Sequence, residues 1–117
     1  MFQPKSWTLL EDIDHACSYI LRKTNGRTLA DYEADETMRL AVERSFENIG
    51  EALLRLERKE PAVLEQVTEP RQVIAFRNRL AHGYDFIENP LVWEIITTTL
   101  PRLLAEVQFL LLQEHTQ

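Results

Sequence analysis

The sequence is poor in cysteine and has no long apolar run. Cys17 is its only cysteine, which excludes an intramolecular disulfide framework, and no early stretch pairs basic residues with a continuous apolar segment as a secretory signal does. The longest uninterrupted apolar runs, such as 109–112, are four residues, whereas a membrane-spanning helix needs about 18 or more. These absences predict a soluble protein of the reducing cytoplasm that makes no membrane contact.

Common motifs for catalysis and cofactor binding are also missing. The chain has no glycine-rich phosphate loop, no Gly-x-Ser-x-Gly nucleophile elbow and no Cys/His spacing typical of zinc sites, so we expect neither a metal nor a cofactor. With 13 Lys and Arg against 19 Asp and Glu, the net charge is −6, which argues against a protein that coats nucleic acid indiscriminately. A small basic cleft that binds a few phosphates is still compatible with this total, because local charges set the potential at a site.

What the chain does contain is the composition of one globular domain. Its 117 residues are about the modal size of a domain, and apolar (44%) and charged (27%) residues occur at ordinary levels. No segment shows the sustained two-residue alternation of a half-buried strand. We therefore predict a single all-α domain over residues 1–117, an antiparallel bundle of four to five helices that gains core by dimerising.

Apolar residues at three- and four-residue intervals predict the helices. The first should begin at a capping box of Thr8 and Glu11 and end near Thr24, and residues 27–36 should then form an acidic surface loop. The second should extend to about Lys59, before Pro61.

Glycine and glutamate within the second helix allow more than one interpretation. Gly50 either permits the close approach of another helix or is simply tolerated there. Glutamates recur every four residues at positions 43, 47 and 51, which is most simply a solvated or salt-bridged face, with a cleft-facing role as the alternative.

Proline and glycine predict the boundaries of the remaining helices. After a short helical or irregular piece near 62–67, a helix should begin at Pro70 and end near Gly83. The last helix should begin at Asn89-Pro90, reach about Gln113 and kink at Pro101.

The segment from Arg77 to Tyr84, Arg-Asn-Arg-Leu-Ala-His-Gly-Tyr, brings a fixed cation, an amide, an imidazole and a phenol into eight residues at a predicted helix end. Arginine offers a planar fork suited to phosphate oxygens, and histidine exchanges protons near neutral pH. No carboxylate interrupts residues 71–84, where three arginines concentrate positive charge. This combination predicts a site that handles phosphate.

Helix geometry separates the roles of these side chains. On an ideal helix Arg77 and His82 would lie about 140° apart, whereas Asn78 and His82 would share a face, so that the amide could orient the imidazole. Arg77 and His82 converge on one phosphate only if the helix loosens near Gly83, or if a second copy of the chain completes the cleft. Since RNA carries its own nucleophile in the 2′-hydroxyl, a histidine and an arginine suffice in principle to cleave it without a metal.

The same residues resemble a known family. Arg77, His82 and Tyr84 match the Arg-x4-His-x-Tyr signature of the HEPN superfamily, and their context resembles its HepT-like toxins. Supporting similarity covers most of the chain and includes residues 39–44, 46–52, 92–93 and 100–101.

This resemblance implies a helical HEPN fold, a homodimer whose cleft is lined by the motif, and a metal-independent endoribonuclease that acts as a toxin. Arg77 and His82 would be catalytic, and Asn78 fits the polar residue that follows the family arginine. The resemblance also implies a small nucleotidyltransferase antitoxin of the MntA type, which transfers AMP to Tyr84 and blocks RNA by occupancy and charge. Arg79 is a candidate RNA contact.

Other interpretations stay open from the residues alone. Arg77 on a solvated helix face and His82 as a cation near a helix C-terminus fit the same spacing, and Tyr84 would then be a packing or capping phenol. A second function also fits, in which the protein is a noncatalytic helical partner. Arg77, Asn78 and Tyr84 would then form the surface that docks a small nucleotidyltransferase or its nucleotide.

Overall fold

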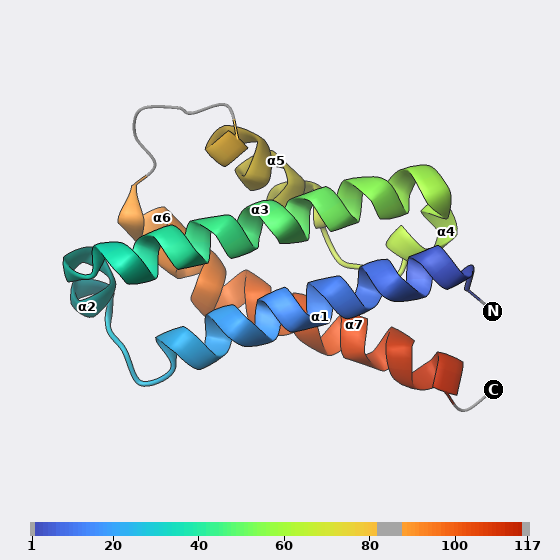
Figure 1. Cartoon of the computed structure of the whole chain (residues 1–117), viewed down its shortest axis with the longest axis horizontal. Helices are drawn as coiled ribbons and strands as arrows, with labels where there is room; N and C mark the ends of the chain where they lie inside the picture. Colours follow the sequence, from blue (N-terminus) through green and yellow to red (C-terminus); the bar gives the residue numbers. More distant parts are fainter. Residues whose placement is uncertain (1, 82–87, 116–117) are drawn as a thin grey trace.

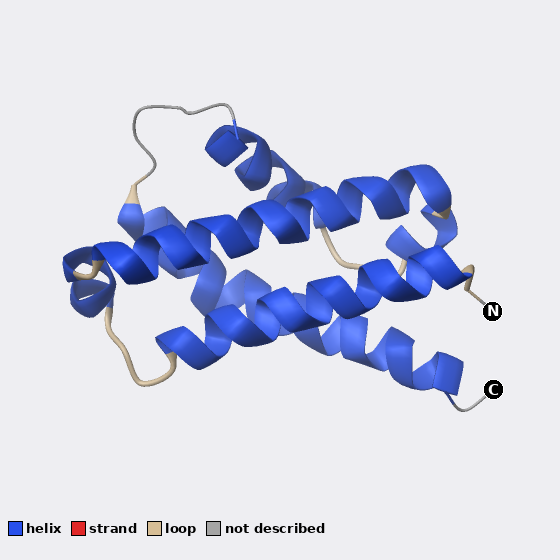
Figure 2. Ribbon diagram, in the orientation of Figure 1, coloured by secondary structure: helices blue, strands red, loops and turns tan. Residues whose placement is uncertain are grey.

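The computed structural model describes residues 2–81 and 88–115, and every regular element within these ranges is helical (Figure 2). This confirms the all-α prediction. Four elements form the bundle and two are short. The long elements are α1 (Pro4–Thr24), α3 (Glu36–Lys59), α5 (Pro70–Ala81) and a continuous stretch of α6 (Asn89–Glu94), the π-helical η1 (Ile95–Thr99) and α7 (Leu100–His115); the short ones are α2 (Leu29–Ala34) and α4 (Pro61–Leu64). The predicted homodimer stays a prediction, as a single chain is described.

Helices α1 and α3 lie side by side in opposite directions, with α7 against α1 and α5 against α3 (Figure 1). The start of α1 therefore lies beside the end of α3, where the backbone N–H of Gln3 donates to Glu60 Oε1 over 3.0 Å. The Cα trace extends over 45 × 30 × 20 Å. The pairing of α1 with α3 and of α5 with α3 positions the features described below.

The apolar stripes predicted from spacing form the core. In α1, Leu10, Ile13, Cys17 and Ile20 are fully buried, and α3 contributes a matching row. Burial, together with the nearby charge of Asp14, raises the pKa of the Cys17 thiol to about 12, so the thiol stays protonated at neutral pH. The α3 row consists of Val42, Phe46, Ile49, Leu53 and Leu56.

The first helix ends at Thr24 as predicted but begins at Pro4, four residues before Thr8. Proline suits the first turn of a helix because its missing N–H has no intrahelical partner there. Thr8 does not cap the helix: its hydroxyl donates to the Pro4 carbonyl over 3.2 Å from within the first turns. The predicted Thr8/Glu11 capping box is therefore wrong.

The acidic loop predicted at residues 27–36 contains the short helix α2. Its capping box is formed by Thr28 and Asp31: the Asp31 N–H donates to Thr28 Oγ1 over 3.1 Å, and the Thr28 N–H donates to Asp31 Oδ2 over 2.9 Å. Tyr32 of α2 is buried and packs on Trp93 of α6, with ring centroids 5.6 Å apart. Asp35 then caps α3 by accepting the Met38 N–H. The acidic residues of this segment are exposed as predicted, but two of them, Asp31 and Asp35, also cap helices.

The later boundaries agree more closely with prediction. Helix α3 ends at Lys59 and α5 begins at Pro70, whereas the predicted end near Gly83 lies outside the described residues. The last stretch begins at Asn89, with Glu88 in the capping position in place of Asn89. A kink was predicted at Pro101. The helix there changes locally to the π-helical turn η1, which ends at Thr99, two residues before the proline. A π-helical turn is one way in which a helix accommodates the hydrogen bond that a proline cannot make.

The stretch Asn89–Gln113 is long and apolar enough to cross a membrane by length and composition, with a mean hydropathy of 1.4 in its most apolar window. Inspection of uninterrupted runs missed this, because polar residues interleave with the apolar ones. The core helix of a soluble protein meets the same criterion. Here the inward positions Val92, Ile96, Leu100, Leu103, Val107 and Leu110 are buried in the bundle.

Candidate active site

Helix α5 crosses α3 in close contact at Gly50. A Cβ atom added to Gly50 would lie 2.2 Å from the Arg77 Cβ and 2.4 Å from its Cγ, which no side chain tolerates. Beside this contact, Phe46, one turn before Gly50, meets Phe76, the residue before Arg77, edge to face, with ring centroids 5.0 Å apart and an interplanar angle of 83°. Of the two interpretations of Gly50, the close approach of another helix is therefore confirmed.

The Arg77 side chain packs against α3 at Gly50 and reaches the neighbouring Glu51. Arg77 Nη2 donates to Glu51 Oε2 over 3.0 Å, and Arg77 Nη1 donates to Asn78 Oδ1 over 3.1 Å. The Arg77 side chain is 26% exposed, and its buried Nε has no hydrogen-bond partner among the residues that the structure describes. Packing of the stem and two hydrogen bonds at the head thus hold the guanidinium in one position.

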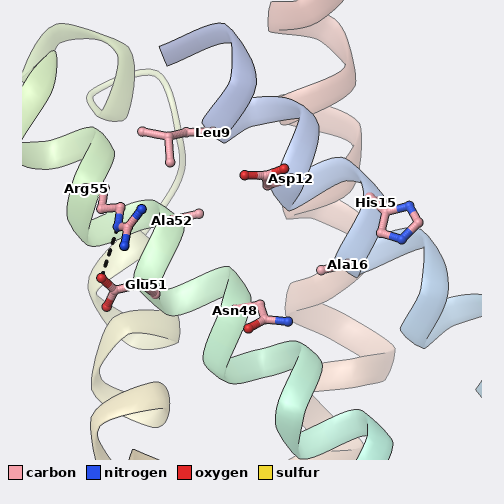
Figure 3. Close-up of a pocket in the computed structure, with 8 residues that line it drawn as sticks. All are labelled: Leu9, Asp12, His15, Ala16, Asn48, Glu51, Ala52 and Arg55. Carbon is pink, nitrogen blue, oxygen red and sulfur yellow. Dashed lines mark hydrogen bonds and ion pairs between the residues drawn. The ribbon is translucent and has the colours of Figure 1, made fainter. Parts of the chain in front are cut away.

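The Glu51 carboxylate is shared by two arginines. Its Oε2 accepts from Arg77, and its Oε1 accepts from Arg55 Nε over 3.2 Å, one turn further along α3 (Figure 3). Arginine has five N–H donors in a planar fork. Within the described residues, Arg77 uses one on each terminal nitrogen, which leaves a second donor on each. A pair of terminal donors is the geometry that binds two oxygens of one phosphate.

The other predicted site residues have different outcomes. Asn78 is half-buried and its amide oxygen accepts from Arg77, so it helps to hold the arginine. Its predicted contact with His82 stays a prediction, because His82 and Tyr84 lie outside the described residues. Arg79 is exposed and has no ion pair with any carboxylate in the described part of the chain.

The positive charge predicted for residues 71–84 is smaller than the sequence suggests. Arg71 pairs with Glu57 of α3, and Arg77 pairs with Glu51, so two of the three arginines face carboxylates from the neighbouring helix. Counting charges along one segment missed this, because the compensating residues are 14 and 26 positions away.

Sequence reasoning underrated Glu51. The spacing of Glu43, Glu47 and Glu51 predicted a solvated or salt-bridged face, and Glu47 does pair with exposed Arg44 at 3.8 Å. Glu51 differs because α5 crosses α3 at this height. One feature of the sequence did point to Glu51: it directly follows Gly50. A glycine in the middle of a long helix costs about 1 kcal/mol of helix stability relative to alanine, which suggests that it is kept for a close contact at this position.

An open hollow of about 360 Å³ lies between α1 and α3 beside this cluster. Figure 3 shows that α1 and α3 contribute equally to its walls. Besides Glu51 and Arg55 it presents exposed polar side chains that can form hydrogen bonds. The lining residues are Leu9, Asp12, His15 and Ala16 from α1 and Asn48, Glu51, Ala52 and Arg55 from α3.

Comparison with known proteins matches most of the length of this chain. A family model described as "Ribonuclease HepT-like" matches residues 13–110. A protein of Caldanaerobacter subterraneus subsp. tengcongensis named "Putative RNase TTE0752" is 29% identical over 105 residues, which cover 90% of this chain and 93% of that protein. No solved structure matches. The family match includes α3, α5 and the Arg77 contact, and it covers more than half of the chain; the protein belongs to the HepT-like ribonuclease family.

Proposed function

We propose that this protein is a metal-independent endoribonuclease whose active site combines Arg77 and His82. The observation that carries the proposal is the anchored guanidinium of Arg77, which packs on Gly50, is held by Glu51 and Asn78, and keeps one donor on each terminal nitrogen within the described residues. Preorganised donors of this kind stabilise charge that develops in a transition state without rearranging. Membership of a ribonuclease family supports RNA as the phosphodiester substrate.

The proposed reaction uses the nucleophile that RNA carries. His82 removes the proton of the 2′-hydroxyl, and that oxygen attacks the adjacent phosphorus while Arg77 binds the two non-bridging oxygens. The bond from phosphorus to the 5′-oxygen breaks, and the leaving oxygen takes up a proton from an imidazolium. The products are a 2′,3′-cyclic phosphate and a 5′-hydroxyl.

The proposed site is assembled from two copies of the chain. Arg77 and His82 are five positions apart, which corresponds to about 140° on an ideal helix, so one helix does not aim both at the same phosphate. A homodimer that places its two motifs across one cleft supplies both groups. Analytical ultracentrifugation tests this step, and mixed dimers of Arg77→Ala and His82→Ala chains should regain part of the cleavage activity that each variant lacks.

We further propose that the enzyme is a cytoplasmic toxin controlled through Tyr84. A nucleotidyltransferase antitoxin of the MntA type would supply a nucleoside triphosphate; the Tyr84 oxygen attacks its α-phosphorus, pyrophosphate leaves and the phenolic proton is lost. A bulky anion next to Arg77 would then compete with RNA. Coexpression with such an enzyme should add AMP masses to the intact protein but not to Tyr84→Phe, whereas a gain that survives this substitution would contradict the assignment.

Cleavage of labelled RNA in EDTA tests the central proposal. The wild type should cleave, His82→Ala should lose cleavage by about 10²-fold or more while its circular dichroism spectrum stays helical, and expression of the wild type alone should arrest growth. Equal cleavage by wild type and His82→Ala would refute the assignment of His82.

A noncatalytic partner of a nucleotidyltransferase is the second candidate function. The observation in its favour is that Arg71 and Arg77 already face carboxylates, which lowers the positive charge available to RNA. Harmless high expression of soluble wild-type protein, with no RNA cleavage and with stable copurification of a nucleotidyltransferase, would support this function over the first.

A further inference from the structure

A second hollow continues the first along the face between α1 and α3. It measures about 510 Å³ and shares Leu9, Asp12 and Arg55 with the hollow described above, so the two form one open channel, the α1–α3 groove. At the far end, where α1 begins and α3 ends, the lining is cationic. The side chains there are Lys5, Thr8, Arg58 and Lys59, and we call the three cations Lys5, Arg58 and Lys59 the basic end.

The three cations of the basic end are not neutralised by neighbouring carboxylates in the described part of the chain. Lys5, Arg58 and Lys59 are exposed and have no carboxylate partner within residues 2–81 and 88–115. By contrast, arginines 44, 55, 71, 77 and 102 each form an ion pair with a glutamate. Asp12 is the one acidic side chain of the second hollow's lining, so the three free cations dominate its charge.

Helix electrostatics accounts for two of these cations but not for the third. Arg58 and Lys59 lie in the last turn of α3, where a positive charge is favoured by the helix dipole. Lys5 lies in the first turn of α1, where the same dipole disfavours it, and no acidic residue occupies that turn. Because α1 and α3 are antiparallel, Lys5 lies beside Arg58 and Lys59. Three positive charges are thereby concentrated, although the positive charge of Lys5 destabilises the N-terminal end of α1.

Glu51 links the groove to the proposed catalytic arginine, which itself lines neither hollow. Glu51 contacts both Arg55, which lines the groove, and Arg77. From Glu51 to Lys59 the rise along α3 is about 12 Å, at 1.5 Å per residue. Exposed Asn48 and His15 line the groove near Glu51 and offer hydrogen bonds or a stacking face to a base.

We propose that the α1–α3 groove binds the single-stranded RNA that flanks the scissile phosphate, with backbone phosphates at Lys5, Arg58 and Lys59. This inference rests on the proposed ribonuclease function and names the part of the substrate that lies beyond the cleavage point. Proteins that bind single strands without strict sequence preference combine a basic groove that follows the backbone with side chains that contact the bases. The phosphate contacts supply affinity, and Arg77 acts on the phosphate next to them.

The salt dependence of RNA binding tests the proposal. The His82→Ala background prevents cleavage, and a fluorescein-labelled single-stranded RNA of about twelve nucleotides reports binding by anisotropy over a range of KCl concentrations. Each lost phosphate contact reduces the slope of log K against log salt by about 0.7, so Lys5→Gln/Arg58→Gln/Lys59→Gln should lower it by about 2 and weaken binding at low salt at least tenfold. The matched control, Arg22→Gln/Lys23→Gln/Arg27→Gln, removes the same charge from the other end of α1 and should leave the slope unchanged.

A cleavage assay separates this inference from the proposed function. In the active protein the basic-end triple variant should cut a dinucleoside monophosphate as the wild type does, because that substrate does not reach the basic end, but should lose about tenfold in kcat/KM on the longer RNA. If the wild type cuts no RNA, the proposed ribonuclease function is refuted. The salt dependence of binding measured by anisotropy would still show whether the groove binds RNA.

Two results would overturn the groove assignment. One is an unchanged slope in the basic-end variant, or an equal change in the control. The other is RNA binding that stays intact while the basic-end variant alone loses copurification with a nucleotidyltransferase, which would make the basic end a protein-docking surface.

Discussion

The α3–α5 contact and the basic end use positive charge in opposite ways. At the first, Arg77 is 26% exposed, its stem packs on Gly50 and its head is held by Glu51 and Asn78. At the second, the cations are exposed and no carboxylate in the described chain restrains them. A restrained guanidinium can be aimed at one phosphate, whereas unrestrained cations add affinity for any phosphate without positioning it. In this protein of net charge −6, the cation proposed to position a phosphate and the cations proposed to attract the RNA backbone therefore lie in separate places.

The largest expected effect comes from Arg77→Lys, which keeps the charge but removes the fork. Lysine is a point charge on a flexible stem and does not reproduce the paired terminal donors. We expect kcat/KM on RNA to fall by about 10²- to 10³-fold, the usual loss when one preorganised donor is removed. Initial rates on the labelled RNA measure this. Activity within threefold of the wild type would show that Arg77 contributes only its charge. Arg77 would then act in the same way as the unrestrained cations of the basic end.

Gly50→Ala should break the α3–α5 contact itself. The new Cβ would lie 2.2 Å from the Arg77 Cβ, so α5 must move. Alanine gains about 1 kcal/mol of helix propensity over glycine, but overpacking costs about 1–3 kcal/mol and displaces the guanidinium. Urea unfolding should show no stabilisation or a net loss, and RNA cleavage should fall strongly. A stabilised and fully active variant would contradict the proposed role of Gly50.

The control for Gly50→Ala is a loss of stability far from both regions. Thr28→Ala removes the cap of α2 and should cost about 1 kcal/mol while cleavage by the folded protein is retained. The hydrogen bonds from Thr28 also lower the pKa of Asp31 below its usual value of 3.8. Their stabilisation is therefore complete above that usual pKa and is lost as the pH falls through the lowered one. The largest cause is the backbone N–H of Thr28, which the alanine variant keeps, so the variant should retain most of this pH dependence.

Glu51→Gln should have an intermediate effect on catalysis. The amide oxygen can still accept from Arg77, but the negative charge shared with Arg55 is gone. Because both side chains of the Arg77 pair are partly exposed, we expect a stability change of about 1 kcal/mol or less. A less firmly aimed Arg77 should lower kcat by roughly three- to tenfold, with KM unchanged or lower since one carboxylate near RNA is removed. A rise in KM at constant kcat would mean that Glu51 does not position Arg77.

The smallest effect on stability is expected at the basic end. Arg58→Gln/Lys59→Gln should lower the free energy of unfolding by less than about 1 kcal/mol, the dipole contribution of exposed cations in a last helical turn. Urea unfolding at low and high salt measures it, and the difference should shrink in salt. A larger loss would make these residues structural and weaken the comparison with Arg77.

Periodic burial was predictable from the sequence, whereas contacts between distant segments were not. The apolar rows of α1 and α3 follow directly from three- and four-residue spacing, as does the limit set by Pro61. Helix α2 was missed because its capping box, Thr28 with Asp31, precedes a segment too short to show periodicity. Glu51 was undervalued because its four-residue spacing is the same as that of Glu47; the neighbouring Gly50 set it apart, but the partner, Arg77 of α5, lies 26 residues later and could not be identified from spacing.

The packing of Tyr32 on Trp93 joins two helices that are far apart in the sequence. Tyr32 belongs to the short helix α2 and Trp93 to α6, which begins the last helical stretch. A helix of six residues is marginal by itself, so α2 depends on this contact and on its caps. In return, α2 supports the beginning of the stretch Asn89–His115, whose inward side chains complete the core. A segment that reads as an acidic connection in the sequence is therefore part of the framework of the bundle.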